Sequence, residues 1–168
     1  MSKAGRPQAA VLTISDSASR GAREDRSGPA VRERLERLGW KVCAIEVLPD
    51  ERDRIAARLA TLADGTQVHA IFTTGGTGLA PRDVTVEATR QVIEREIPGF
   101  GELMRARGRQ STPLAMLSRA TAGARGRVLI VNLPGSPRGA VESLDAIAEL
   151  LPHTVDLLNG KTEHPESE

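Results

Sequence analysis

Three aspartates and two glycine-containing turns stand at points in the sequence where phosphate chemistry is feasible. Asp16 and Asp50 closely follow apolar runs, and Asp83 follows a third run after the turn Gly75-Gly76-Thr77-Gly78. A second turn of this kind is Pro134-Gly135-Ser136. Glycines between a strand and a helix expose backbone N–H groups, and a helix N-terminus adds positive potential, so such turns favour a bound phosphate. Carboxylates beside a phosphate are oxygen ligands for Mg²⁺. The pattern therefore indicates a nucleotide or phosphate-ester site.

The elements that must position these residues alternate along the chain. Short runs of apolar, β-branched residues predict buried strands, and apolar residues at helical spacing predict helices between them. Strands that alternate with helices predict an α/β fold, with a mostly parallel central sheet and helices on both faces. The predicted strands are 9–14, 42–48, 70–74, 117–121 and 127–132, the last two joined by a hairpin-like connection at 122–126. The predicted helices are 29–38, 51–64, 86–94, 100–107 and 141–151, with a polar loop at 18–27.

The predicted sheet brings the acidic and glycine-rich turns together. In parallel sheets, ligands bind outside the carboxyl ends of the strands, where the strand-to-helix turns lie. Asp16, Asp50, Asp83 and both glycine turns follow strands, so we expect them at one edge of the sheet. This convergence carries more weight than any single turn.

Each of these residues also has a purely structural interpretation. Asp50 suits the N-cap of a helix that begins at Glu51, and Asp83 suits the cap of the following helix. Asp16 can hold its loop through an Asx-turn. Ser136 before Pro137 is equally a capping pattern. Capping and phosphate binding do not exclude each other, because a helix N-terminus attracts both carboxylates and phosphates.

Composition narrows the class of protein. The 168 residues suit one domain, and a net charge of +1 argues against a general nucleic-acid binder. The single cysteine, Cys43, lies in an apolar run and is predicted to be a core residue of a cytosolic protein. No apolar stretch is long enough for a signal peptide or a membrane span. We expect a soluble, cytoplasmic protein that binds neither membrane nor nucleic acid.

Several familiar sites are absent from the sequence. It contains no P-loop motif, and its glycine turn lacks the third glycine of a dinucleotide-binding fingerprint. The three histidines, His69, His153 and His164, are scattered, which argues against a zinc site and against a Ser-His-Asp triad. The remaining candidate is a phosphate-binding backbone with acidic residues, which suits Mg²⁺ bridging nucleotide phosphates.

The motifs at these turns resemble, in order, those of the MogA/MoaB family of molybdenum-cofactor biosynthesis, which is related to gephyrin-type G domains. The resemblance covers residues 9 to 158, and the combined signal is specific whereas any single piece is weak. The matching segments are Leu12–Ser17, Asp25–Pro29, Leu48–Glu51, Thr73–Gly78 with Arg82–Thr85, Ile97–Glu102 and Asn132–Pro137.

The resemblance implies a three-layer α/β/α fold, usually trimeric, that binds molybdopterin. Catalytic members of the family use Mg²⁺ and ATP to form adenylylated molybdopterin and pyrophosphate. The resemblance also implies hand-over of the product to a MoeA-type molybdenum insertase. The alternative is a MoaB-type paralogue that binds or carries molybdopterin without adenylylating it. Residues 9–158 would form the molybdopterin-binding domain, flanked by flexible ends at 1–8 and 159–168.

The resemblance also assigns residues. Asp50 and Asp83 match the functional carboxylates of the family, and one or both would hold Mg²⁺. The residues that match the substrate and nucleotide pocket are Ser15, Asp16, Ser27, Gly28, Gly75, Gly76, Thr77, Gly78, Arg82, Pro134, Gly135 and Ser136.

Overall fold

A six-stranded sheet forms the centre of the computed structural model, which describes residues 5–162. Its strand order is β2-β1-β3-β6-β5-β4. β1, β2, β3 and β6 are parallel, and β5 runs antiparallel to both β6 and β4. The mostly parallel sheet with a hairpin-like edge is thus confirmed. The strands are β1 (Gln8–Ile14), β2 (Lys41–Leu48), β3 (Ala70–Thr74), β4 (Arg95–Glu96), β5 (Ala122–Arg125) and β6 (Val128–Leu133).

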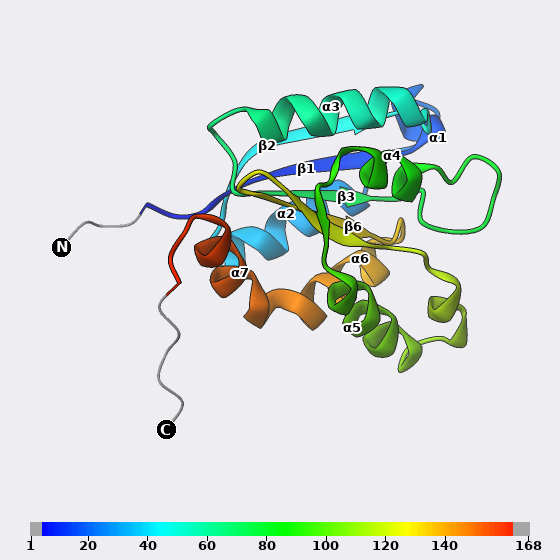
Figure 1. Cartoon of the computed structure of the whole chain (residues 1–168). Coiled ribbons are helices and arrows are strands. Elements are labelled where there is room, and N and C mark those ends of the chain that lie inside the picture. The colour runs from blue at the N-terminus through cyan, green and yellow to red at the C-terminus, as the bar shows by residue number, and fades with distance from the viewer. Residues whose placement is uncertain (1–4, 163–168) are drawn as a thin grey trace.

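Helices cover both faces of the sheet and complete the three layers (Figure 1). One face packs against α2 (Ser27–Arg37), α5 (Pro98–Arg109), α6 (Pro137–Ile147) and α7 (Leu151–Leu158). The other packs against α3 (Arg52–Asp64) and α4 (Thr85–Val92). The remaining short elements are α1 (Asp16–Ser19) and the 3₁₀ turns η1 (Pro113–Leu117) and η2 (Ala148–Leu150).

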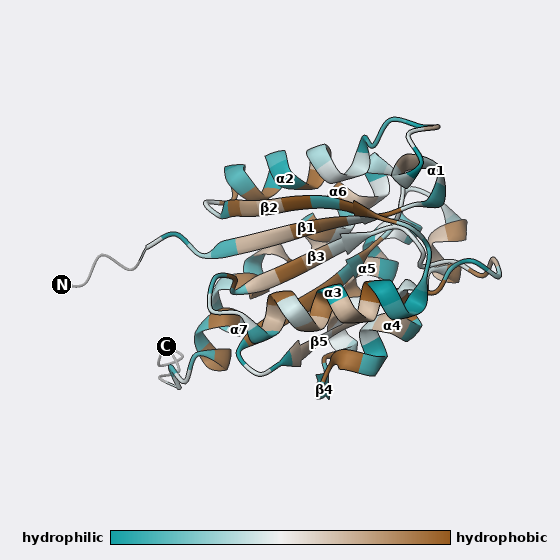
Figure 2. Ribbon diagram, turned by 90° about the horizontal axis from the view of Figure 1, so that it is seen from above, coloured by the Kyte–Doolittle hydropathy of each residue, from teal (hydrophilic) through white to brown (hydrophobic). Residues whose placement is uncertain are grey.

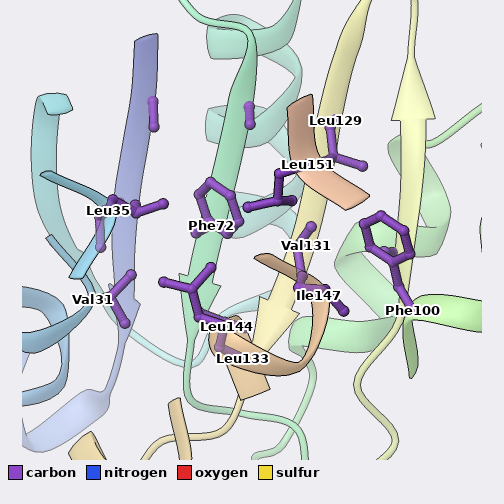
Figure 3. Close-up of a cluster of buried hydrophobic side chains, with 14 of the residues drawn as sticks. Val31, Leu35, Phe72, Phe100, Leu129, Val131, Leu133, Leu144, Ile147 and Leu151 are labelled. Atoms are coloured by element: carbon purple, nitrogen blue, oxygen red, sulfur yellow. The ribbon is translucent and has the colours of Figure 1, made fainter. Parts of the chain in front are cut away.

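Alternation along the strands divides the core into two clusters. Phe72 points to the face covered by α2, α6 and α7, and its neighbour Ile71 points to the face covered by α3 and α4. Phe72 is fully buried among aliphatic side chains (Figure 3), and Trp40 meets its ring edge-on at 6.0 Å. Each such buried aliphatic or aromatic side chain contributes about 1.5–3 kcal/mol. These clusters fix the strand ends that form the site.

The prediction that Cys43 is a core residue is wrong, because Cys43 lies on β2, one of the two edge strands of the sheet. Figure 2 shows hydrophobic residues on β2 as well as on β1 and β3, but β2 has a neighbouring strand on one side only. Cys43, predicted to be buried, is exposed. It lies where the register with β1 shifts, so that Val42 and Ala44 pair with consecutive residues of β1 and Cys43 pairs with none. A bulge on an edge strand turns its extra residue out of the core.

The hairpin edge also differs from prediction. The expected strand at 117–121 is wrong: Leu117 ends the turn η1, and β5 begins at Ala122, inside the expected connection. The Ala-Gly-Ala sequence of β5 carries no strand propensity. Pairing with β6 imposes its conformation, and a side chain at Gly123 would come within 2.6 Å of the Arg95 carbonyl oxygen of β4.

Several element boundaries differ as well. The predicted loop 18–27 is preceded by the short helix α1, which includes Ala18, and α4 ends at Val92 because the chain then enters β4. The last predicted helix is divided into α6 and α7. Of the flexible ends expected at 1–8 and 159–168, residues 1–4 and 163–168, with His164, lie outside the described residues, and β1 already begins at Gln8. No helix within residues 5–162 is long and apolar enough to cross a bilayer.

Candidate functional site

The site is built where the carboxyl ends of β1, β3 and β6 pack together through their backbones. The order in which the strands are added to the sheet reverses at β1, because β2 lies on one side of β1 and β3 on the other. Such a switch point is the usual ligand site of parallel sheets. Gly75 follows β3 with φ +98°, and a Cβ there would overlap the Ile14 carbonyl oxygen of β1. A Cβ at Gly135 would meet Gly75 Cα at 3.3 Å. Glycine at Gly75 is therefore required by both conformation and close approach.

A polar cavity of about 540 Å³ opens above these strand ends. It brings together residues from β1, the end of β2, the glycine turn and the start of α6, as the parallel sheet predicted. Asp50 and Asp83 both line it. The other predicted residues in its wall are Ser15, Ser27, Gly75, Gly76, Gly135 and Ser136.

Asp16 and Asp50 are tied to each other across the ends of β1 and β2. The Asp16 N–H donates to Asp50 Oδ2 at 2.8 Å, and the Asp50 N–H donates to Asp16 Oδ1 at 3.0 Å. The Arg82 guanidinium donates to both Asp16 oxygens at 2.9 Å. Asp16 and Arg82 thus line a separate surface hollow rather than the polar cavity, and Arg82 is not aimed at the cavity as its sequence assignment suggested.

The two carboxylates therefore differ in charge balance. The hydrogen bonds from Arg82 hold the pKa of Asp16 below its ordinary value. Burial raises the pKa of Asp50, and the negative charges of Asp16 and Asp83 add to this effect against the opposing hydrogen bond from the Asp16 N–H. Asp50 is consequently a carboxylate whose charge is only partly compensated by the protein.

The capping interpretations of Asp50 and Asp83 are not what the structure shows. Glu51 precedes α3 and Val84 precedes α4, and neither helix has a side-chain cap. The Asp83 carboxylate instead accepts the Ala80 N–H at 2.9 Å and closes its own loop. Ser136 does cap α6, accepting the Gly139 N–H at 3.1 Å. Both aspartates are therefore free of helix capping.

The sequence analysis assigned no role to Asp25, although Asp25 lies in one of the matching segments; in the structure it lines the polar cavity and binds the residues around it. Its carboxylate accepts the Thr13 hydroxyl at 2.7 Å, the Gly28 N–H at 3.1 Å and the Ser27 hydroxyl at 3.4 Å. The Thr74 hydroxyl lies 2.7 Å from the Ser27 hydroxyl. Ser27 thus lies inside α2 rather than capping it; Arg26 is the N-cap and makes no side-chain cap, while Asp25 before it accepts the Gly28 N–H of the first turn. A Cβ at Gly28 would come within 2.5 Å of Asp25, so glycine makes room for the carboxylate. The pattern Asp-x-x-Gly before a helix was the available signal.

An apolar cavity of about 290 Å³ lies beside the polar one, and Ser136 belongs to both walls. Three predicted residues, Thr77, Gly78 and Pro134, line this second cavity rather than the first. The rest of its wall comes from α5, η1 and α6, including Met104, which no sequence motif marked. Polar and apolar compartments therefore meet at the turn 134–136.

Backbone donors are available at the junction of the two cavities. Within residues 5–162, the N–H groups of Gly76, Thr77 and Gly135 have no hydrogen-bond partner. Successive free N–H groups in a turn with positive φ form a concave anion-binding surface, and Gly76 has φ +66°. The predicted phosphate-binding chemistry of the glycine turn is compatible with this geometry.

The donor set also fits Mg²⁺. Mg²⁺ is commonly held by one or two carboxylates together with water and substrate phosphates. Asp50 and Asp83 supply two carboxylates to one cavity, and Asp50 Oδ1 has no hydrogen-bond donor within residues 5–162. No cluster of three or more His, Cys, Asp or Glu side chains suited to a metal occurs in that range, so the remaining ligands would come from water and phosphate.

Comparison with known proteins identifies the family. Residues 10–153 match the family described as the probable molybdopterin binding domain. The molybdopterin adenylyltransferase of Helicobacter pylori is 45% identical over 152 residues, which cover 89% of this chain and 86% of that protein. That of Escherichia coli is 38% identical over 164 residues, covering 89% and 84%. The crystal structure of the molybdopterin biosynthesis enzyme MoaB from Thermus thermophilus shares 51% identity, with a TM-score of 0.86 and coverage of 92% and 97%. The chain therefore belongs to the family of probable molybdopterin-binding domains.

Proposed function

We propose that the chain is a molybdopterin adenylyltransferase of molybdenum-cofactor biosynthesis. A phosphate oxygen of molybdopterin attacks the α-phosphorus of ATP, the bond to the bridging oxygen breaks, and pyrophosphate leaves. The names of the relatives support the reaction. The observation that carries it to this chain is the shared polar cavity in which Asp50 and Asp83 face the glycine turn.

The task of the protein is to hold two anionic substrates in line and to offset their repulsion. The free N–H groups of Gly76, Thr77 and Gly135 support binding of phosphate oxygens. Asp50 and Asp83 would hold Mg²⁺, which would supply positive charge beside the α-phosphate of the transferred adenylyl group and the leaving pyrophosphate. Because the N–H donors belong to the backbone, they would need little reorganisation during the reaction.

Positive charge in the wall of the polar cavity supports the same assignment. Arg23 and Arg26, from the loop before α2, line this cavity together with Gly75 and Gly76 of the glycine turn. Arg26 has an exposed ion pair with Glu24 at 3.4 Å, which is weak and can be exchanged for a phosphate. Because Arg82 is paired with Asp16, Arg23 and Arg26 are the cations that would bind the substrate phosphates.

The apolar cavity supports a place for a flat heterocycle. Its wall of Met104, Leu114, Leu117 and Pro134 is predominantly aliphatic, and it adjoins the polar cavity at Ser136. Ligand sites commonly combine an apolar compartment with a few polar groups that fix orientation. A substrate with a ring in this cavity and its phosphate in the polar cavity would therefore span Ser136.

The proposal includes four further properties of the protein: its domain extent, its compartment, its assembly and the acceptor of its product. Residues 9–158 form the molybdopterin-binding domain, the protein acts in the cytoplasm, it assembles as a homotrimer, and its product passes to a MoeA-type insertase. Exposed large apolar side chains support an interface of some kind, since Ile45 and Val47 on β2 are 40% and 38% exposed. Sedimentation equilibrium measures the assembly directly.

Incubation with molybdopterin, ATP and Mg²⁺ tests the activity. We expect pyrophosphate and adenylylated molybdopterin in equal amounts, and we expect Asp83→Asn to remain folded while losing most turnover. The competing function is a molybdopterin carrier, as in the alternative that the family resemblance leaves open. Tight molybdopterin binding by the wild-type protein without any pyrophosphate release would replace the enzyme by that carrier.

A further inference from the structure

The loop that carries Asp83 has no secondary structure of its own. It joins β3 to α4 and projects from the carboxyl edge of the sheet (Figure 1). Leu79 is 68% exposed, and the Arg82 side chain is 62% exposed. Burial therefore contributes little to holding this segment, so polar contacts must fix its position.

Arg119, which lies between η1 and β5, supplies those contacts. Its N–H donates to the Thr77 carbonyl at 2.9 Å, and its Nε donates to the Gly78 carbonyl at 2.8 Å. Its Nη2 donates to the Asp83 carbonyl at 2.9 Å. One side chain thus bridges the beginning and the end of the loop, and the position of Asp83 depends on it directly.

The guanidinium is itself anchored by Glu87 on α4. Nη1 donates to Glu87 Oε1, and Nη2 lies 3.4 Å from Glu87 Oε2. These hydrogen bonds hold the pKa of Glu87 below its ordinary value, so the pair stays charged near neutral pH. The anchor ties the loop to the first turns of α4, whose start also binds the Gly76 carbonyl through the Thr85 N–H at 3.2 Å.

We propose that Arg119 is a positioning residue for the adenylyl-transfer site, because it fixes both ends of the 77–83 loop so that Asp83 faces Asp50. The proposal rests on the proposed function. Five donors spread over three nitrogens in a rigid plane allow arginine to bind two carbonyls and a carboxylate at once, whereas the three donors of lysine all radiate from one nitrogen. A displacement of about 1 Å at a reacting group commonly costs on the order of 100-fold in rate.

Arg125 offers a matched control at the opposite edge of the sheet. It also binds a carboxylate through two nitrogens, Asp64 at 2.8 and 3.0 Å, and a backbone carbonyl, Val92 at 3.0 Å. It touches neither cavity. Arg119→Lys and Arg125→Lys therefore remove comparable hydrogen bonds, and only the first removes them from the loop.

The experiment measures pyrophosphate release and amide hydrogen exchange for the wild type and both variants. We expect Arg119→Lys to lower kcat by about 10- to 100-fold, to raise the Mg²⁺ concentration needed for half-maximal rate, and to speed exchange in residues 77–83. We expect Arg125→Lys to lower the melting temperature similarly but to keep kcat within about twofold. Equal loss of kcat in both variants, or unchanged exchange of the loop in Arg119→Lys, overturns the proposal.

Failure of the proposed function has a different signature. A wild-type protein that releases no pyrophosphate rejects the enzyme activity while the exchange measurement on the free protein still decides whether Arg119 holds the loop. Glu87→Gln supplies a graded second variant. It keeps the carbonyl contacts but removes the ionic anchor, so we expect kcat and exchange to fall between those of the wild type and Arg119→Lys; values equal to the wild type in both measurements would remove Glu87 from the positioning role.

Discussion

The backbone N–H of Asp16 and the carboxylate of Asp50 are hydrogen-bonded at 2.8 Å, and the reverse pair, Asp50 N–H and Asp16 carboxylate, at 3.0 Å. This exchange locks the ends of β1 and β2 together beneath the polar cavity. Arg82 neutralises Asp16 from the outside. Asp50, in contrast, is left facing the cavity with Asp83, so the protein concentrates uncompensated negative charge where a cation is needed.

That charge imbalance predicts opposite effects of Asp50→Asn on stability and on activity. The pKa of Asp50 is raised in the folded protein, so its favourable contribution is present at low pH and is lost as the pH rises through the folded-state pKa. Asparagine keeps an oxygen for the Asp16 N–H but carries no charge. We expect the variant to be more stable than the wild type at pH 7 by roughly 0.5–2 kcal/mol, and turnover to fall by about 100-fold or more.

Urea denaturation at pH 7 and pH 3 checks the sign. The stability gap should close at pH 3, where Asp50 is protonated in both states and resembles asparagine. Asp53→Asn is the control: this first-turn acid of α3 is 84% exposed and pairs with Arg52 at 3.3 Å, so its loss should lower stability by less than about 1 kcal/mol and leave turnover unchanged. A wild type more stable than Asp50→Asn at pH 7 would contradict the assignment of Asp50 as an uncompensated carboxylate.

Mg²⁺ should raise the melting temperature of the wild-type protein at pH 7 even without substrate. A ligand that binds only the folded state stabilises it by mass action, by about 1.4 kcal/mol at ten times its Kd. The increase should be smaller in Asp50→Asn and Asp83→Asn and unchanged in Asp53→Asn, as followed by differential scanning calorimetry. The same increase in all four proteins would place the cation elsewhere.

The backbone contact at the glycine turn predicts a large difference between two substitutions that both affect glycines with positive φ. Gly126 has φ +54°, and a Cβ there would have no atom within 4 Å, whereas a Cβ at Gly75 would overlap the Ile14 carbonyl oxygen. Gly126→Ala should cost about 1 kcal/mol from backbone conformation alone. Gly75→Ala should cost at least about 2 kcal/mol more. Equal losses in thermal or urea unfolding would mean that close approach of β1 and β3 is unimportant.

The sequence could predict that the residues lining the polar cavity lie close together, because parallel strands are recognisable from local sequence patterns and their carboxyl ends share one edge of the sheet. The apolar runs before Asp16, Asp50 and the glycine turn are strong strand signals, and parallel strands share one carboxyl edge. Asp50, Asp83 and the glycine turn accordingly share one cavity. The glycine turn itself was recognisable, although its first glycine serves strand packing as much as phosphate binding.

Contacts between residues far apart in the sequence could not be predicted from local sequence patterns. The Arg82–Asp16 pair spans 66 residues and removes Arg82 from the cavity. Arg119 meets Gly78 across 41 residues of sequence. β5 has no strand propensity and exists because β6 pairs with it. A sequence without an alignment contains no signal for such pairings, so the support of the site was less predictable than its position.

Two buried threonines one turn apart on α4 should respond oppositely to replacement by valine. The Thr85 hydroxyl lies against Gly76 without a hydrogen-bond partner within residues 5–162, whereas the Thr89 hydroxyl accepts the Asn132 amide at 2.8 Å. Removing an unpaired buried hydroxyl relieves a desolvation cost, so Thr85→Val should stabilise the protein by about 1 kcal/mol. Thr89→Val leaves that amide short of one acceptor and should destabilise the protein by about 1–3 kcal/mol. A destabilised Thr85→Val in urea denaturation would show that the Thr85 hydroxyl is hydrogen-bonded after all, and a stabilised Thr89→Val would show that the Asn132 amide does not need this acceptor.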